Sequence, residues 1–179
     1  MAGLLALSAG IDKLSRAFGM LAAVFVLLSC MISAGNALSR YALNISANSW
    51  LEIQWQMFAA IFLLGSAYVL QLNEHVRVDM VYGGLPARGK LWIDVFGLLF
   101  FLFPATALMF WFGVPWFVKS YLAGEMSSNA GGLPVWPVKL LLPLGFALLF
   151  LQGISELIKR IAALRGIVTL TVTYEKPLK

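Results

Sequence analysis

The sequence predicts an all-α integral membrane protein with four transmembrane helices, because its composition is too apolar for a soluble domain. Hydrophobic residues make up 61% of the 179 residues and charged residues only 12%, whereas a soluble domain carries about 25% charged residues. The charge-free stretches are long enough to cross a bilayer, and short polar segments separate them. Lipid is therefore the expected solvent for most of the chain, with room for short interfacial helical segments between the spans.

The limits of the spans follow from the distances between successive charges. Three charge-free runs, 17–39, 53–73 and 95–118, satisfy the requirement of ~20 apolar residues for a spanning helix. A fourth span is expected from Trp136 to Ile158, with Lys139 and Lys159 reaching to the two interfaces. We expect one four-helix domain over residues 1–179, with spans at about 17–39, 53–73, 93–118 and 136–158 and a tail at 159–179.

Lysine and arginine residues are divided unequally between the two sides of the membrane. Ten lie with the two termini and the loop between the second and third spans: Lys13, Arg16, Arg77, Arg88, Lys90, Lys159, Arg160, Arg165, Lys176 and Lys179. Three lie on the other side: Arg40, Lys119 and Lys139. The positive-inside rule therefore predicts that both termini are cytoplasmic.

The charge-free interiors of the spans offer none of the ionisable groups that proton relays, ion-coupled sites and voltage sensors require. A small four-span exporter would need a carboxylate there, and a membrane haem subunit would need histidine ligands. The single histidine, His75, lies in a loop, and the single cysteine, Cys30, cannot form an internal disulfide. The basic residues form no patch suited to nucleic acid. We expect no enzymatic activity, cofactor or metal in this chain.

Span one carries a polar stripe, in which Ser29, Ser33, Asn36 and Arg40 follow at helical spacing on one face. Such a face lets helices approach closely in lipid. It fits packing among the chain's own helices or packing onto another membrane protein, and spacing does not separate the two. In span three, Pro104 predicts a kink, which fits a static bend or a functional hinge.

The loop between spans one and two predicts a capped helix. Ser49 or Asn48 can cap a helix that begins at Trp50, and Glu52 would then lie in its first turn, where a negative charge suits the helix dipole. The plain interpretation is the start of the second span, and the functional one is an interfacial segment shaped for a partner. The loop between spans three and four adds the polar residues Glu125, Ser127, Ser128 and Asn129.

The cytoplasmic loop between spans two and three begins with the charged stretch NEHVRVDM, residues 73–80. His75 has no second histidine or cysteine beside it, so metal binding is not expected. Arg77 and Asp79 can form a local ion pair, or Asp79 can cap a turn. By themselves these charges describe a solvated connector between two helices.

The ordered set of motifs resembles a known family. The set comprises RY at 40–41, W-L-E at 50–52, G-S-A at 65–67, H-V-R-V-D at 75–79, L-P-A-R at 85–88, G-E-M-S at 124–127 and G-L-P-V-W-P at 132–137. In order and spacing it is similar to the small membrane subunit, of DctQ type, of tripartite ATP-independent periplasmic (TRAP) transporters. The resemblance covers residues 12–165, and the succession of motifs on a four-span plan carries it.

This resemblance implies a scaffold in the bacterial inner membrane. In such systems a periplasmic binding protein captures an organic acid, and a large, sodium-coupled membrane subunit moves it elevator-fashion. The small subunit packs beside the large one, and sodium is expected in that partner. On this basis the NEHVRVDM loop would fix the small subunit to the large one, and the outward loops would meet the large subunit or the binding protein. The candidate contact residues are Arg40, Trp50, Glu52, His75, Arg77, Asp79, Glu125, Ser127 and Asn129.

Two other interpretations remain open at this point. The chain could be a scaffold or assembly subunit of another membrane complex, or a small oligomeric exporter, against which the missing intramembrane carboxylate argues. The stretch IVTLTVTY, residues 167–174, alternates with a period of two. It fits pairing with another chain or a disordered tail.

Overall fold

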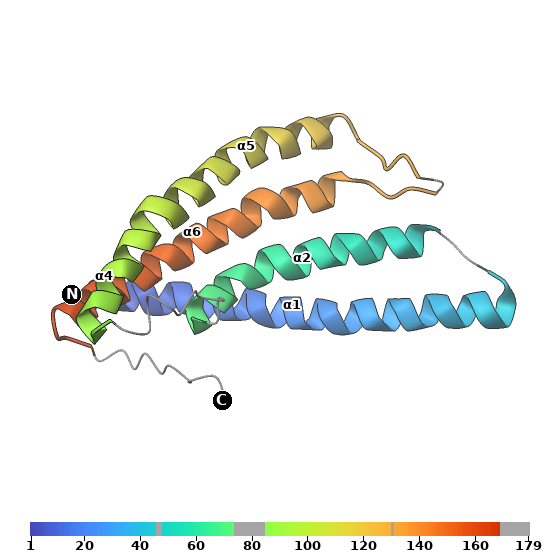
Figure 1. The fold of residues 1–179 in the computed structure, drawn as a ribbon. Helices are drawn as coiled ribbons and strands as arrows, with labels where there is room; N and C mark the ends of the chain where they lie inside the picture. The colour runs from blue at the N-terminus through green and yellow to red at the C-terminus, as the bar shows by residue number, and fades with distance from the viewer. Residues whose placement is uncertain (46–47, 74–84, 130, 169–179) are drawn as a thin grey trace.

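The computed structural model describes residues 1–45, 48–73, 85–129 and 131–168. Its elements are α1 (Ala2–Leu43), α2 (Asn48–Leu72), α4 (Ala87–Gly97), the π-helical turn η1 (Leu98–Leu102), α5 (Phe103–Leu122) and α6 (Trp136–Leu164). Because α4, η1 and α5 follow one another without a break, they form one rod. The described residues thus contain four rods long and apolar enough to cross a membrane (Figure 1), and this confirms the predicted fold class.

The helices continue beyond the expected apolar runs. α1 has 42 residues, or about 63 Å at 1.5 Å per residue, against a hydrocarbon thickness of ~30 Å. Asp12 and Arg16 lie inside it, before the expected start at residue 17, and α6 continues past Ile158 to Leu164. A charged residue ends an apolar run without ending a helix, since lysine and arginine are good helix formers.

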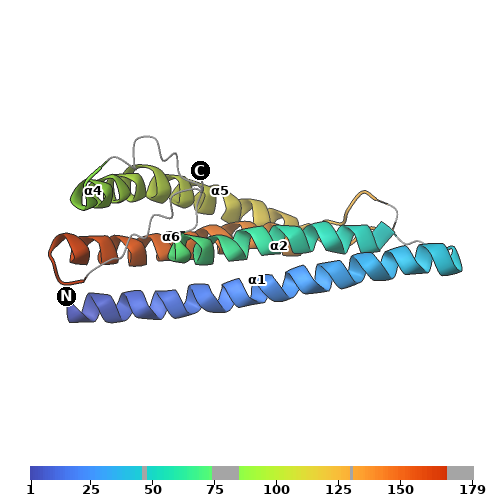
Figure 2. The ribbon, with the colours of Figure 1, turned by 60° about the horizontal axis from the view of Figure 1, so that its bottom comes forward.

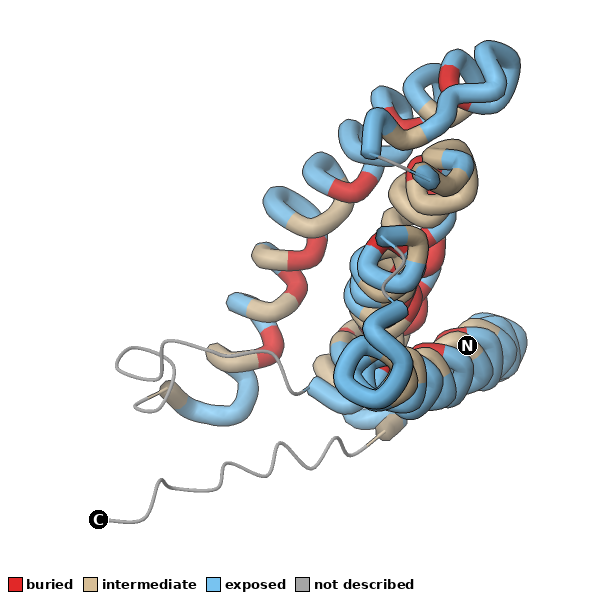
Figure 3. Tube along the Cα trace, turned by 90° about the vertical axis from the view of Figure 1, so that its right-hand side faces the viewer, coloured by how far each residue is buried: buried red, intermediate tan, exposed pale blue. Residues whose placement is uncertain are grey.

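α6 is the central rod of the molecule. It contacts α1, α2, α4 and α5, while α1 and α2 also pack along each other (Figure 2). In its most apolar stretch 39% of the residues are buried, against 17% in each of the other three rods. Figure 3 shows the buried positions where rods meet and long exposed surfaces elsewhere. The arrangement leaves broad apolar faces for lipid or for a partner.

The contact between α2 and α6 depends on small residues. Ala60, Leu64 and Ala67 of α2 form a buried cluster with Leu148 of α6. Near this cluster, a Cβ added to Gly145 would lie 2.7 Å from the Leu63 Cβ and 2.8 Å from its carbonyl oxygen. Only glycine permits this approach, which is how helices gain packing energy in lipid.

The third rod changes its helical pitch directly before Pro104. The π-helical turn Leu98–Leu102 precedes α5, and Pro104 lies in the first turn of α5. Proline has no backbone N–H to donate, and a wider turn accommodates that loss. The rod follows an arc over α6 (Figure 1). A distinct kink at Pro104 stays a prediction.

Candidate functional site

Glu52 of α2 organises the polar cluster at the end of the molecule where α1 meets α2 and α5 meets α6, hereafter the turn end. Its side chain is only 1% exposed. Ser127 Oγ and Asn129 Nδ2 both donate to Oε1, the latter at 2.7 Å, and the Leu133 backbone N–H donates to Oε2 at 2.6 Å. Three donors satisfy both carboxylate oxygens, as a buried charge requires. Glu52 thereby attaches the connection between α5 and α6 to α2.

A second ion pair closes the same connection. Lys139 Nζ donates to Glu125 Oε2 and lies 4.7 Å from the centre of a Trp116 ring. The Lys139 ammonium lowers the pKa of the Glu125 carboxyl below its ordinary value by donating a hydrogen bond to it. The Val135 backbone N–H also donates to the Glu125 carbonyl oxygen at 3.0 Å. Hydrogen bonds therefore hold the connection between α5 and α6 at both of its ends.

The start of α2 differs from the sequence prediction. The helix begins at Asn48, two residues before Trp50, so Glu52 lies beyond the first turn, and no acidic residue lies in that turn. Its carboxylate accepts hydrogen bonds from the loop, where the sequence prediction had it interacting with the helix dipole. Glu52 is buried and bound by the loop, and its contact with a partner stays a prediction.

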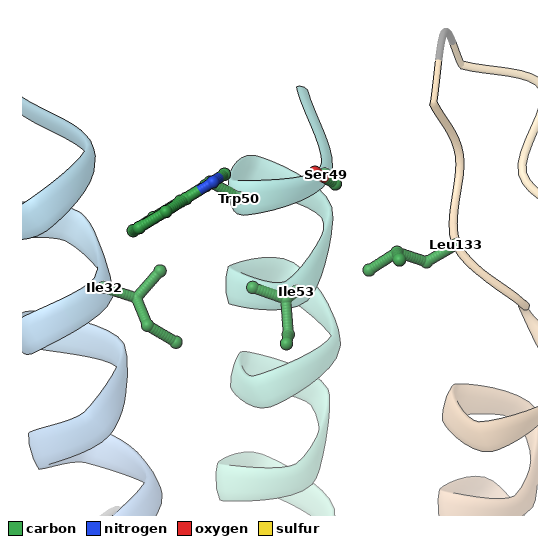
Figure 4. A pocket seen from close by; sticks show the side chains of 5 residues that line it. All are labelled: Ile32, Ser49, Trp50, Ile53 and Leu133. Carbon is green, nitrogen blue, oxygen red and sulfur yellow. The ribbon is translucent and has the colours of Figure 1, made fainter. Parts of the chain in front are cut away.

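The other candidate contact residues at this end are divided between two surfaces. Trp50 extends from α2 toward Ile32 of α1, while Leu133 points toward Ile53, and together they line a pocket of about 340 Å³ (Figure 4). Arg40 is exposed near the end of α1 and lines a separate groove. Contact of these residues with a partner stays a prediction. Three further candidates, His75, Arg77 and Asp79, lie outside the described residues, as does most of the tail stretch 167–174.

A second polar cluster, at the end that holds the N-terminus of α1 and the C-terminus of α6, was missed by the sequence analysis. We call it the termini-end cluster. Asp12 of α1 accepts hydrogen bonds from Gln152 Nε2 at 3.0 Å and Ser155 Oγ at 2.7 Å, and its Oδ2 lies 2.7 Å from Lys159 Nζ. The Ser15 hydroxyl donates to Gln152 Oε1 at 2.7 Å. These contacts attach the first third of α1 to α6.

The same cluster also attaches α4 to α6. Arg160 is 6% exposed and Glu156 is 5% exposed. The Arg160 guanidinium donates to Glu156 from Nη1 and to Asp94 Oδ2 of α4 from Nε, the latter at 3.0 Å. Lys159 Nζ lies 2.8 Å from Glu156 Oε1. The buried charges are thus paired inside the chain, which is the condition under which burial is tolerated.

A sequence signal for this cluster exists in the helical spacing. On α6, Gln152, Ser155, Glu156 and Lys159 recur at the intervals of one helical face. On α1, Ser8, Asp12 and Ser15 do the same. Glu156 lies inside the span predicted at 136–158 and is buried there, so the expectation of a charge-free interior is wrong for this span. Its charge is tolerated because Lys159 and Arg160 pair with it.

The two clusters hold helices together. Among the residues that the structure describes, no group of three or more histidine, cysteine, aspartate or glutamate side chains is placed to hold a metal ion. The carboxylates of Asp12, Glu52 and Glu156 are each occupied by donors from other segments or turns. The arrangement defines a four-helix integral membrane protein whose buried charges fasten its rods and its turn-end connection.

Comparison with known proteins places this membrane protein in a family. Residues 29–163 match the family model described as tripartite ATP-independent periplasmic transporters, DctQ component. The chain belongs to this family, which is a transporter component and not an enzyme family. It is similar to the ectoine TRAP transporter small permease protein TeaB of Halomonas elongata, with 26% identity over 154 residues that cover 86% of this chain and 79% of the relative.

Proposed function

We propose that this chain is the small permease subunit of a TRAP transporter and serves as a fixed membrane scaffold for a large elevator subunit. The proposal rests on one observation: the buried charged side chains are bound by other residues of the same chain. Glu52, Glu156 and Arg160 are bound by partners within the chain. A subunit that coupled ions to movement would need such groups at a site that binds and releases ions. In a scaffold, the same groups serve only to hold the helices together.

The rigid helix contacts support the same role. Gly145 packs against the Leu63 backbone, and Gly19 and Gly153 also face side chains of neighbouring rods too closely for a Cβ. Close packing of this kind resists sliding, because each displaced rod would meet a backbone or a ring. A stationary partner of this kind would give the moving part of the large subunit a fixed reference in the bilayer.

The outer surfaces offer separate places for the two expected partners. α5 exposes large apolar side chains, among them Trp111 at 75% and Phe112 at 63%, and this face suits the large membrane subunit or lipid. The turn-end connection, held by Glu52, exposes Glu125, Ser128 and Asn129 and is the surface that we assign to a periplasmic binding protein. With both termini cytoplasmic in the bacterial inner membrane, as the lysine and arginine distribution predicts, this connection faces the periplasm.

Co-purification tests the assignment directly. The tagged chain is expressed with its native membrane neighbours and purified in mild detergent. We expect a large multi-span protein in stoichiometric amount. A chain that purifies alone, or only with copies of itself, would refute the scaffold role.

Transport measurements test the finer parts of the proposal. The co-purified complex is reconstituted in vesicles with its binding protein, and uptake of labelled organic acids and of ectoine is followed with and without a sodium gradient. We propose sodium-dependent uptake of an organic acid. Uptake of ectoine and of no organic acid would indicate the substrate that the name of the relative TeaB gives. Uptake that does not change with the sodium gradient would exclude sodium coupling.

The loop that contains Arg77 and Asp79 supplies a further test, which rests on the sequence. Replacing both residues together should lower the amount of large subunit that co-purifies with the chain. Full co-purification and normal uptake would contradict a contact role for this loop.

A further inference from the structure

A polar groove lies between the turn-end halves of α1 and α2. It has a volume of about 670 Å³ and is lined by Ser33, Asn36, Ala37, Arg40, Tyr41, Asn44, Leu51 and Gln54. Arginine is the charged residue in this lining, and no carboxylate accompanies it. Within the described part of the chain no ion pair joins Arg40 to an acidic residue. The groove therefore presents a positive side chain that no acidic residue of the described segments neutralises.

A buried donor in the same groove also lacks a partner. Gln54 Nε2 is hidden from solvent and makes no hydrogen bond to the described residues. An unsatisfied buried donor costs about 1–3 kcal/mol, so a partner, whether a water or a bound molecule, is expected for Gln54 Nε2. Gln54, Asn36 and Arg40 all line this groove. Phosphate oxygens are acceptors that suit this set.

The polar groove continues into an apolar one. A second cavity, of about 280 Å³, shares Ser33 and Gln54 with the first and extends along the rods past Cys30 and Phe58 to Val26 and Ile61. From Arg40 to Val26, α1 advances about 21 Å at 1.5 Å per residue. This is roughly half of a bilayer of ~40–45 Å. The two cavities together have the length and the polarity order of one lipid in one leaflet.

We propose that this continuous α1–α2 groove binds an anionic phospholipid from the leaflet at the turn end. The phosphate lies by Arg40, with Asn36 and Gln54 as further donors, and an acyl chain follows Cys30, Phe58 and Ile61. Trp50 packs close to Gly35 of α1, 3.4 Å from where its Cβ would be, at the depth where tryptophan marks the headgroup region. A lipid in this groove does not depend on assembly with a transporter.

Native mass spectrometry of the full-length chain in mild detergent tests the site. Dioleoyl phosphatidylglycerol and dioleoyl phosphatidylcholine, which share acyl chains and differ in charge, are titrated separately, and the dissociation constant for the first bound lipid is measured. We expect tighter binding of the glycerol lipid. Arg40→Gln should weaken that binding by about tenfold, the size expected for one charge-assisted phosphate contact. Arg16→Gln, the same change at the other end of α1, should leave it unchanged.

A second variant probes the apolar half without altering the charge. Cys30→Trp places a large ring in the lower cavity from an exposed position on α1, so the fold should tolerate it while lipid binding weakens. Millimolar inorganic phosphate should not displace the lipid, since it lacks the acyl anchor.

Several results would overturn the proposal. Equal affinity for the two lipids, unchanged binding in Arg40→Gln, or unchanged binding in Cys30→Trp would each do so. Displacement by inorganic phosphate would identify an anion site in place of a lipid site. A co-purified large subunit that crosslinks from position 40 and excludes the lipid would assign the groove to that protein.

Discussion

The Lys159 ammonium of α6 lies 2.7 Å from Asp12 Oδ2 of α1 and fastens the two ends of the chain's helical part to each other. The two side chains are each about one-fifth exposed. Ser155 and Gln152 complete the hydrogen bonding of Asp12. The first third of α1 is thereby part of the packed structure, although it precedes the long apolar run that marked the span.

Asp12→Asn and Lys159→Met should each destabilise the protein. Lys159→Met leaves the partly buried Asp12 carboxylate without an ion-pair partner, and Asp12→Asn leaves Lys159 paired with Glu156 alone. The double variant should lose less than the sum of the two single losses, with a coupling of about 0.5–3 kcal/mol. Thermal unfolding in detergent measures this cycle, and a loss of 1 kcal/mol lowers the Tm by roughly 2–4 °C at this chain length. Lys13→Met, an exposed neighbour, serves as the control. Strictly additive losses would show that the pair contributes no interaction energy.

Glu52→Ala should release the connection between α5 and α6. The change removes both acceptor oxygens from three donors, so the loop loses its attachment to α2. Limited proteolysis should cut the connection faster in Glu52→Ala than in the unaltered chain. Ser128→Ala, an exposed change in the same loop, should have no effect. Equal cutting rates in all three proteins would contradict the fastening role of Glu52.

Gly145→Ala should separate α2 from α6, because the new Cβ would meet the Leu63 backbone at 2.8 Å. Overpacking of this kind costs about 1–3 kcal/mol, and the Tm should fall accordingly. Gly10→Ala is the matched control, since nothing lies within 4 Å of its added Cβ and alanine favours a helix by roughly 0.5–1 kcal/mol. A Gly145→Ala protein as stable as the control would disprove the close contact.

The Glu125–Lys139 pair predicts a pH dependence. The pKa of Glu125 is lowered in the folded protein, principally by the hydrogen bond from Lys139. Its stabilising contribution is therefore fully present above the ordinary value of 4.5 and is lost as the pH falls through the lower folded value. The Tm difference between the unaltered protein and Glu125→Gln should be constant from pH 7 to 6 and shrink below about 4.5. A difference that stays constant down to pH 3 would mean that the carboxylate charge does not contribute.

The sequence by itself determined the number of membrane rods and the general class of protein. Apolar runs bounded by charges are a local property, and lipid solvation acts on each run separately, so the four rods could be read directly. The start of α6 at Trp136 was predicted beyond the charge-free run, by letting Lys139 extend to the interface. The ordered loop motifs likewise indicated the transporter family before any contact between helices was known.

Only the tertiary structure decided which charged side chains hold the helices and the loop together. Asp12 and Lys159 are 147 positions apart, and Glu52 meets Leu133 across 81 positions. Whether such groups are solvated or buried depends on which helix faces meet, and spacing within one helix does not contain that information. Arg40 and Gln54 likewise line one groove only because α1 and α2 pack against each other, and the sequence does not contain that contact.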